Sequence, residues 1–320
     1  MPVRTAAPLA RRAGIRRRAA TALFSLLWLV ALGTPPAVAA VHRAAAVTSI
    51  SAGSYHTLAV TGGRVLAWGG NWFQNTNPPP AASAGVSAVA AGGFHSLALR
   101  GGQVLAWGDS RHGETTVPAE AASGVTAIAA GMGFSLAVSG GKVLAWGDAA
   151  EGRTAVPAAA GSGVSAVAAG HFHALALRNG QVLAWGDNRH GQTTVPAAAR
   201  TGVSAIAAGN GFSLALKNGQ VLAWGWNRFG QATPPETTRT GVSAIAAGHF
   251  HALAVRDGQV LAWGESLEGR TAVPTAARTG VDAVTAGEAH SVAVRDGRVL
   301  AWGYNGDGET NVPGEIALSG

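Results

Sequence analysis

The stretch Val104-Leu105-Ala106-Trp107-Gly108 decides the fold of this chain, because the same five residues occur seven times at constant spacing. Each copy places a tryptophan 39 residues after the previous one. The seven tryptophans are Trp68, Trp107, Trp146, Trp185, Trp224, Trp263 and Trp302. A strict period of roughly 20 to 50 residues indicates one supersecondary unit copied along the chain. We therefore expect a ring or an array of seven equivalent units.

Residues 86–124 show how one unit is built. They contain three short apolar runs bounded by glycine, at 86–91, 94–100 and 103–107, followed by a polar loop and a linker rich in alanine, serine and glycine. Runs of this length are too short for helices, so the pattern predicts three β-strands. Both faces of these strands are largely apolar, as expected for a sheet that is covered on both sides.

A pair of residues that tolerate positive φ separates the second run from the third in every repeat. The pairs are Gly62-Gly63, Gly101-Gly102, Gly140-Gly141, Asn179-Gly180, Asn218-Gly219, Asp257-Gly258 and Asp296-Gly297. Two-residue hairpin turns of type I′ require positive φ at both positions. The sequence therefore predicts an antiparallel hairpin in each repeat.

Small residues dominate the first run of each repeat, which suits strands that crowd around a central axis. Small sheets radiating from a centre form a β-propeller, and the polar capping repeats of a linear solenoid are not visible. We predict an all-β, seven-bladed β-propeller with three clear antiparallel strands per blade. Its 39-residue repeats start at residues 47, 86, 125, 164, 203, 242 and 281 of a single domain, 47–320. Residues 115–118 are candidates for a short outer fourth strand, limited to an edge by Pro118.

The first forty residues differ from the rest of the chain. Six arginines precede the uncharged stretch 19–32, and two prolines and a run of small residues follow it. This order is typical of a secretory signal peptide. The alternative, a membrane anchor, is disfavoured because the stretch is too short to span a bilayer. We expect a cleaved signal at 1–40, a short leader at 41–46, bacterial export to the extracellular space, and no stable membrane insertion afterwards.

Removal of the signal changes the charge of the protein. The whole chain has 23 basic and 16 acidic residues. Six of the basic residues and none of the acidic ones lie in 1–40, so the remainder carries 17 − 16 = +1. A chain this close to neutral has no general basic surface for a phosphate backbone, and we expect no nucleic-acid partner. The chain has no cysteine, which excludes disulfides and thiolate chemistry.

Aromatic residues outside the periodic tryptophans gather in two loops of each repeat. In an antiparallel meander, the loop after the first strand and the loop after the third strand lie at the same end of the sheet. All eleven such residues after position 40 fall in these loops or at their edges. They are Tyr55, Trp72, Phe73, Phe94, Phe134, Phe172, Phe212, Trp226, Phe229, Phe250 and Tyr304. One face rich in aromatic and arginine side chains has the composition of a protein-binding hot spot.

The alternative is that these aromatic residues fill gaps between blades. We expect this for Phe134 and Phe212, because they replace a histidine found at the same position of the other five repeats. His171 and His173 place two imidazoles on one side of a strand, as in a metal site, and so do His249 and His251. No third ligand recurs, so we expect structural histidines, no metal and no cofactor.

No motif for an enzyme is visible: the chain contains no nucleophile elbow, no phosphate loop and no pair of acids that departs from the repeat. A catalyst usually needs unique residues at one point of a ring. The unique residues here are aromatic and spread around it, so we do not expect an enzyme. We expect a monomer.

The repeat, with its pattern Gly-Val-x-Ala-Ile/Val-Ala-Ala-Gly followed by His-Ser-Leu-Ala-Leu and Val-Leu-Ala-Trp-Gly, resembles that of the regulator of chromosome condensation family. Residues 185–196, Trp-Gly-Asp-Asn-Arg-His-Gly-Gln-Thr-Thr-Val-Pro, are more similar still to the type II β-lactamase inhibitory proteins. The resemblance covers 47–313. It implies an exported seven-bladed propeller whose loop aromatics clamp class A β-lactamases over the mouth of the active site.

The resemblance and the aromatic loops together define the candidate partner-binding residues. They are Tyr55, Trp72, Phe73, Phe94, Arg111, His112, Phe172, Arg189, His190, Trp226, Arg228, Phe229, Phe250 and Tyr304. Three repeats have Gly133, Gly211 or Ala289 in place of the loop aromatic, so we expect one arc of the face to make no contact with a partner. The chain also starts at the first strand of a repeat, unlike the inhibitory proteins, so ring closure is expected to differ.

Three functions follow from these observations. The first is a secreted, non-catalytic inhibitor of class A β-lactamases. The second is an exported propeller that binds another protein or a carbohydrate with the same face; unequal loops argue mildly against a lectin, which favours equal pockets in every blade. The third, nucleotide exchange as in the nuclear relatives, conflicts with the export signal.

Overall fold

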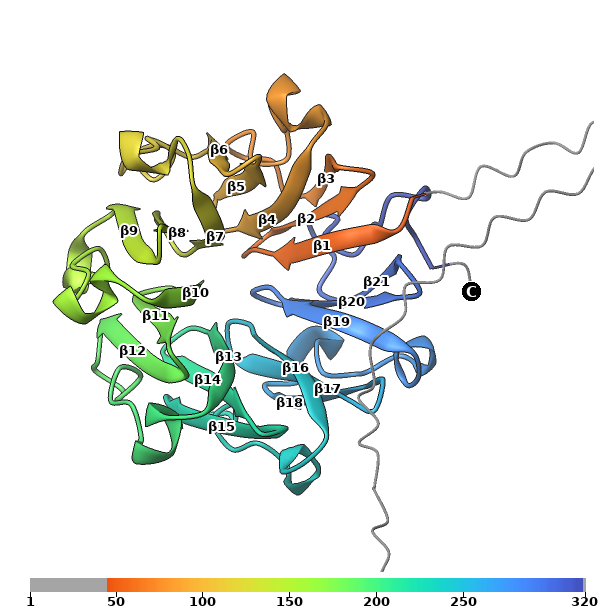
Figure 1. Ribbon diagram of the computed structural model, residues 1–320. Coiled ribbons are helices and arrows are strands. Elements are labelled where there is room, and N and C mark those ends of the chain that lie inside the picture. The colour runs from red at the N-terminus through yellow and green to blue at the C-terminus, as the bar shows by residue number, and fades with distance from the viewer. Residues whose placement is uncertain (1–44, 319–320) are drawn as a thin grey trace, which may run out of the picture. The chain divides into compact units, whose positions relative to one another are not determined.

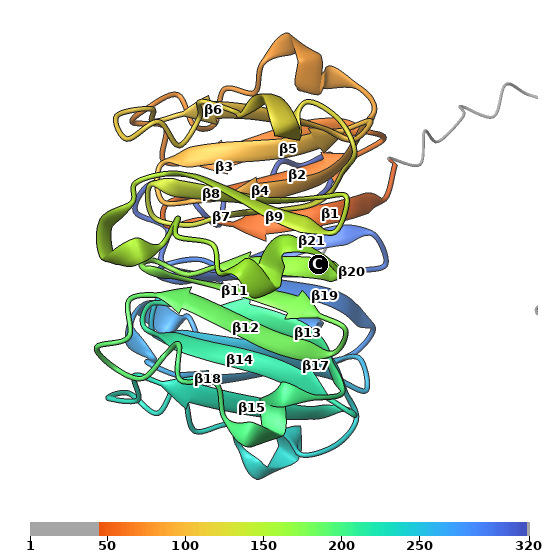
Figure 2. The same ribbon diagram turned by 60° about the vertical axis from the view of Figure 1, so that its left-hand side comes forward.

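The computed structural model of the protein describes residues 45–318, so the predicted signal at 1–40 lies outside the described residues. Seven three-stranded antiparallel sheets surround a central axis in these residues, and no α-helix occurs among them (Figure 1). The all-β, seven-bladed propeller is confirmed. Figure 2, turned by 60°, shows the blades stacked face against face, with loops at both ends of the strands.

Each blade is one complete repeat. The inner strands are β1 (Val47–Ala52), β4 (Val86–Ala91), β7 (Val125–Ala130), β10 (Val164–Ala169), β13 (Val203–Ala208), β16 (Val242–Ala247) and β19 (Val281–Ala286). The middle strands are β2 (His56–Thr61), β5 (His95–Arg100), β8 (Phe134–Ser139), β11 (His173–Arg178), β14 (Phe212–Lys217), β17 (His251–Arg256) and β20 (His290–Arg295). The outer strands are β3 (Arg64–Gly69), β6 (Gln103–Gly108), β9 (Lys142–Gly147), β12 (Gln181–Gly186), β15 (Gln220–Gly225), β18 (Gln259–Gly264) and β21 (Arg298–Gly303). Blades 1 to 7 are numbered in this order.

The hairpin turns between middle and outer strands have the predicted geometry. At Asn179 and Gly180, for example, φ is 51° and 76°, and the other six pairs are also positive at both positions. The expected short fourth strand at 115–118 does not form, because the Val117 N–H donates to the Thr115 carbonyl two residues away rather than to a strand. Short 3₁₀ helices connect the blades instead. They are η1 (Pro80–Ser83), η2 (Ala119–Ala121), η3 (Ala150–Gly152), η4 (Ala158–Gly161), η5 (Ala197–Arg200), η6 (Glu236–Thr238), η7 (Leu267–Gly269) and η8 (Thr275–Ala277).

The hydrophobic core lies between neighbouring blades, not within one. In one such cluster Leu136 and Val138 of blade 3 pack against Ala176 and Trp185 of blade 4. The indole N–H of each repeated tryptophan donates to a backbone carbonyl in the loop of the preceding blade; from Trp185 it reaches the Arg153 carbonyl at 2.8 Å. Each tryptophan therefore both fills an interface and satisfies its one polar group there.

Blade 7 closes the ring directly onto blade 1. The indole of Trp68 donates to the Glu309 carbonyl at 2.9 Å, which repeats the contact made between all other neighbours. The Val47 N–H donates to the Gly297 carbonyl at 2.9 Å. Ile316, buried in the same interface, belongs to the tail that pairs with β21. Because every blade is made of consecutive strands, closure depends on side-chain packing and a few hydrogen bonds rather than on a blade shared between the two ends.

The inner strands line a central cavity of about 360 Å³. Seven glycines, one after each inner strand, approach their neighbours around the axis: a Cβ on Gly92 would lie 2.7 Å from the Gly131 carbonyl oxygen. The contact repeats around the whole ring and ends where Gly287 meets Gly53. Only glycine permits backbones to come this close, which explains the invariant Ala-Gly at this point of the repeat.

Candidate binding face

One end of the ring carries both variable loops of every blade, and we call it the loop face. In blade 2 the Asp109 N–H, just after the outer strand, donates to the Phe94 carbonyl just after the inner strand, at 3.0 Å. An equivalent bond joins the two loops in each of the other blades. The hairpin turns lie at the opposite end, where the Gly102 carbonyl accepts the N–H of Val125. All fourteen candidate residues are located in or beside the loops of this face.

A first aromatic patch covers blades 1 and 2 and consists of Tyr55, Trp72, Phe73 and Phe94. The ring centroids of Tyr55 and Trp72 are 4.7 Å apart, and Phe94 lies 5.5 Å from Tyr55 and 5.4 Å from Phe73. Trp72 is 54% exposed, whereas the other three are half-buried beneath or beside it. The guanidinium of Arg111 lies 4.5 Å above the Phe73 ring and extends the patch. The rings therefore hold one another in place before any partner arrives.

A second aromatic patch covers blades 4 to 6 and consists of His190, Trp226, Phe229 and Phe250. His190 stacks on Trp226 with centroids 4.8 Å apart, and Phe250 meets the edge of Trp226 at 5.0 Å and Phe229 at 5.2 Å. Phe229 is 37% exposed, and Trp226 and Phe250 are half-buried. Arg228 lies 5.7 Å above the Phe229 ring. The loop face thus presents two separate platforms.

The candidate residues differ in exposure. Four candidates at the centres of their loops are half-buried against neighbouring rings: Phe73, Phe94, Phe172 and Trp226. The exposed candidates are Trp72, Arg111, His112, Arg189, His190, Arg228 and Phe229. Tyr55, Phe250 and Tyr304 are half-buried. Side chains that share an aromatic cluster shield one another, which no single loop sequence reveals.

Two arginines of the face are held by buried carboxylates. Arg111 Nη2 lies 2.7 Å from Asp109 Oδ2, and Arg189 Nε lies 2.9 Å from Asp187 Oδ1. Burial opposes the charge on Asp109, but hydrogen bonds from Arg111 outweigh it and lower the pKa of the carboxyl below its ordinary value. The same balance, with Arg189 as donor, lowers the pKa of Asp187. Both carboxylates, which directly follow Trp-Gly, also accept a backbone N–H from the loop.

The three repeats without a loop aromatic do not lie next to one another in a single arc of the ring. They are blades 3, 5 and 7, which alternate around the ring, so that expectation was wrong. In blade 5, Trp226 covers Gly211. In blade 3 the absence of a ring leaves a cavity of about 180 Å³ beside Gly133, and in blade 7 a cavity of about 340 Å³ beside Ala289. We call these the blade 3 cavity and the blade 7 cavity.

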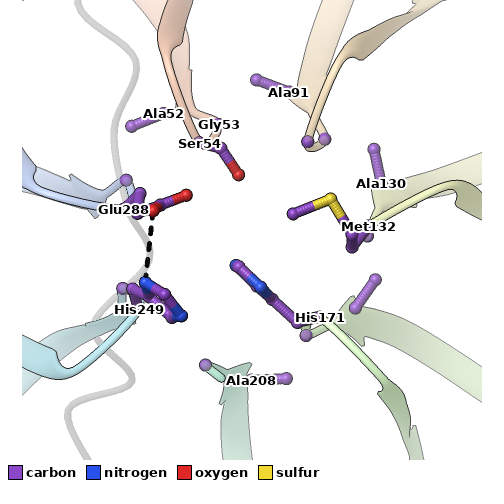
Figure 3. A pocket seen from close by; sticks show the side chains of 18 of the residues that line it. Ala52, Gly53, Ser54, Ala91, Ala130, Met132, His171, Ala208, His249 and Glu288 are labelled. Carbon is purple, nitrogen blue, oxygen red and sulfur yellow. Dashed lines mark ion pairs between the residues drawn. The ribbon is translucent and has the colours of Figure 1, made fainter. Parts of the chain in front are cut away.

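Five residues surround the axis at the loop face, and we call this place the channel mouth; none of them was predicted to be a partner-binding residue. Figure 3 shows Ser54, Met132, His171, His249 and Glu288 around the axis. The imidazoles of His171 and His249 stack with centroids 4.6 Å apart, and His249 Nδ1 lies 3.5 Å from Glu288 Oε1. Burial and the neighbouring His249 lower the pKa of His171 to about 3. Each of these residues directly follows the Ala-Gly of its repeat, which is the signal that would have found them.

The two histidines of each predicted pair have different surroundings. Whereas His171 lies at the channel mouth, His173 is buried between blades, with its Nε2 2.9 Å from Ser213 Oγ. Within residues 45–318 no group of three histidine, aspartate or glutamate side chains has the geometry of a metal site.

In the same residues, no helix has the length and hydropathy needed to cross a membrane.

Comparisons with known proteins agree with this architecture. The sequence model described as "Regulator of chromosome condensation (RCC1) repeat" matches residues 47–72, 86–114, 164–192 and 203–231. No curated protein shows a significant sequence match to this chain.

Solved structures with the same fold come from several organisms. Prp20p of Saccharomyces cerevisiae, described with its binding to Gsp1p and histones, aligns with a TM-score of 0.63 at 20% identity, covering 87% of this chain and 88% of its own. Human WBSCR16 gives 0.62 at 19% identity, covering 78% and 86%. The CRINKLY WD40 ectodomain of the receptor kinase ACR4 from Arabidopsis thaliana gives 0.61 at 19% identity, covering 81% and 98%. Four of the seven repeats therefore match the RCC1 repeat model, and these solved structures share the propeller fold of this chain.

Proposed function

We propose that the protein is an exported, non-catalytic binding protein whose loop face docks onto another protein. The observation that carries this proposal is the concentration of aromatic and arginine side chains in two preformed patches at one end of the ring. Such residues supply most of the affinity in protein interfaces, because they bury large rigid surfaces at little conformational cost. Exposed Trp72 and Phe229 mark the two platforms.

We further propose that the partner is a class A β-lactamase and that docking blocks its active site. The resemblance of residues 185–196 to the type II β-lactamase inhibitory proteins supports this choice of target, and the arginine-rich start of the chain supports export. Inhibition of this kind needs no chemistry on the target. A rigid ring with aromatic groups on one end is sufficient to cover a concave active-site mouth.

The test uses purified residues 41–320 and a class A β-lactamase that hydrolyses a chromogenic β-lactam. We expect the rate of hydrolysis to fall as the propeller is added, with saturation at a 1:1 ratio. Unchanged hydrolysis at micromolar propeller excludes the β-lactamase as the partner. A class B metallo-β-lactamase serves as the control, since the proposal predicts no effect on it.

A further inference from the structure

The blade 7 cavity differs from the rest of the loop face in its chemistry. It has a volume of about 340 Å³ and lies where Ala289 replaces the loop aromatic of blade 7. Tyr55, Phe250 and Tyr304 line it from three different blades. A cavity at the lower end of the size range for small-molecule sites fits one side chain or a small organic molecule.

The charge that lines this cavity is negative. Glu265, Glu268 and Glu288 line it, and among the described residues Arg270 is the only arginine or lysine that does. Arg270 is already paired, since its Nη1 lies 2.7 Å from Glu265 Oε2 and both side chains are largely buried. Within residues 45–318, Glu268 and Glu288 therefore have no lysine or arginine partner.

The pKa shifts of the groups that line the cavity agree with a negative electrostatic potential there. Burial opposes ionisation of Glu288, but hydrogen bonds from His249 and Tyr55 outweigh it and lower the pKa of this carboxyl, so it is charged at neutral pH. Burial, followed by the charges of Asp307 and of two glutamates, raises the pKa of the Tyr304 hydroxyl. His249 adds positive charge only when it is protonated.

We propose that the blade 7 cavity binds an organic cation, an alkylammonium or guanidinium group of the size of a lysine or arginine side chain. The faces of Tyr55, Phe250 and Tyr304 would contact the alkyl part and attract the charge through their quadrupoles. Glu268 and Glu288 would accept hydrogen bonds from the N–H groups at the charged end. On a partner protein, this group would be the side chain of an exposed lysine or arginine at the edge of the docked surface. This last step rests on the proposed function.

The blade 3 cavity provides an internal reference. It too is lined by carboxylates and by the rings of Phe94 and Phe172. Two of its three carboxylates are matched by arginines, however: Asp148 Oδ2 lies 3.3 Å from Arg153 Nη1, and Asp109 is held by Arg111. The third, Glu114, is buried and accepts the backbone N–H of His112 at 2.9 Å. The proposal therefore predicts that a cation enters the blade 7 cavity and not the blade 3 cavity.

The experiment titrates the purified protein with n-butylammonium, and separately with n-butylguanidinium, at constant ionic strength. Binding is followed by the amide shifts of Glu268 and Ala289, with those of Gly133 as the reference. We expect saturable shifts at Glu268 and Ala289 and none at Gly133. Neutral n-butanol, which has a similar alkyl chain, should leave all three unshifted. Absence of saturation, or equal shifts with butanol, overturns the proposal.

Matched variants identify the groups responsible. Glu268→Gln and Glu288→Gln keep the size of each side chain and remove its charge, and together they should weaken binding of butylammonium about tenfold. Glu120→Gln, an exposed glutamate in η2, is the control and should leave binding unchanged. Glu268→Gln alone, on an exposed loop, should weaken binding partially even if the double variant is unstable. Undiminished binding in Glu268→Gln contradicts the proposal. Since no β-lactamase is present, this test succeeds or fails independently of the proposed function.

Discussion

At the scale of single residues, the loop face is asymmetric although the scaffold that carries it repeats. The same two loop positions hold aromatic, glycine, alanine or charged residues in different blades. Where the aromatic is present it stacks on its neighbours, as Tyr55 and Phe94 do. Where it is absent, Trp226 covers Gly211 in blade 5, and cavities form beside Gly133 in blade 3 and Ala289 in blade 7. We therefore expect these few residues, rather than the fold, to select the partner.

Trp72 is the residue on which we expect binding to depend most. It is 54% exposed and rests on Tyr55 and Phe94, so a partner can bury a ring whose orientation is already determined. Trp72→Ala should weaken inhibition of a class A β-lactamase by about 2 kcal/mol, or about thirtyfold in the inhibition constant. Phe73→Ala should have a similar effect, because it also releases Arg111.

The control for these substitutions is Lys142→Ala, an exposed residue that follows a hairpin turn at the opposite end of the ring. Its inhibition constant should match that of the unaltered protein. If Trp72→Ala and Phe73→Ala both inhibit as well as the unaltered protein, the binding residues lie elsewhere on the ring.

The glycines that follow the inner strands and approach one another around the axis should not tolerate a side chain. A Cβ on Gly131 would lie 2.6 Å from the Gly170 carbonyl oxygen and would collide with the ring of Phe134. We expect Gly131→Ala to lower the free energy of unfolding by about 3 kcal/mol. Gly161→Ala is the matched control, because no atom lies within 4 Å of an added Cβ there. Urea denaturation measures both, and equal stability of the two variants would contradict the packing described here.

At the scale of elements, one pair of positions joins the middle strands of neighbouring blades. A histidine at the start of one strand meets a hydroxyl 40 residues later, as in His95 and Ser135, whose Nε2 and Oγ are 2.9 Å apart. The hydroxyl of Ser135 donates to the Glu114 carbonyl, so the imidazole Nε2–H is the donor to Ser135. The five pairs are His56–Ser96, His95–Ser135, His173–Ser213, His251–Ser291 and His290–Thr57.

The two blades that have phenylalanine at this position change the partner as well. Phe134 and Phe212 are fully buried, as the sequence predicted. The residues 40 positions later are Ala174 and Ala252, and each lies in the same core cluster as its phenylalanine. A polar pair is thus replaced by an apolar pair as a unit, which avoids a buried hydroxyl or imidazole without a partner.

A double-mutant cycle tests this pairing. Phe212→His alone should destabilise the protein by about 1 to 3 kcal/mol, because its Nε2–H would be buried without an acceptor. Adding Ala252→Ser restores the acceptor, and we expect a favourable coupling of about 1 kcal/mol in urea denaturation. The mismatched combination of Phe212→His with Ala174→Ser, which lies in another interface, should be additive. Equal coupling in both combinations would show that the positions do not interact in pairs.

At the scale of the whole molecule, the five buried histidines should make the ring sensitive to acid. Burial lowers the pKa of each: to about 3 for His56 and His251, and to about 4 for His95, His173 and His290. In the unfolded chain an imidazole titrates near about 6.5. Below that pH the unfolded state binds more protons than the folded state, so stability falls as pH falls from about 6.5 toward 4.

We expect these five histidines together to lower the free energy of unfolding by about 7 kcal/mol between pH 7.5 and pH 5.5, or about 1.4 kcal/mol for each. Urea denaturation at the two pH values measures the difference. Replacing one pair by the apolar alternative, as in His173→Phe with Ser213→Ala, should reduce it by about a fifth. His112→Gln, on the exposed face, should leave it unchanged. Equal stability at both pH values would contradict burial of neutral imidazoles.

The sequence by itself determined the scaffold of this protein. A 39-residue period, glycine-rich hairpin turns and repeated tryptophans specify strands, their order and a closed ring of seven, because each feature acts locally and recurs in every unit. The sequence also predicted the burial of Phe134 and Phe212. The repeat places each of them at the position that a histidine occupies in the other five blades, so their environment could be inferred from the repeat.

Only the tertiary structure decided how the side chains of the loop face are arranged. The two aromatic patches, the blade 7 cavity and the group at the channel mouth each join side chains from different blades, such as Tyr55 and Tyr304, that are far apart in the chain. Their distances depend on how the ring closes and on which side chains cover one another. The repeat specifies that such residues share a face, but closure through packing of blade 7 against blade 1 specifies which of them meet.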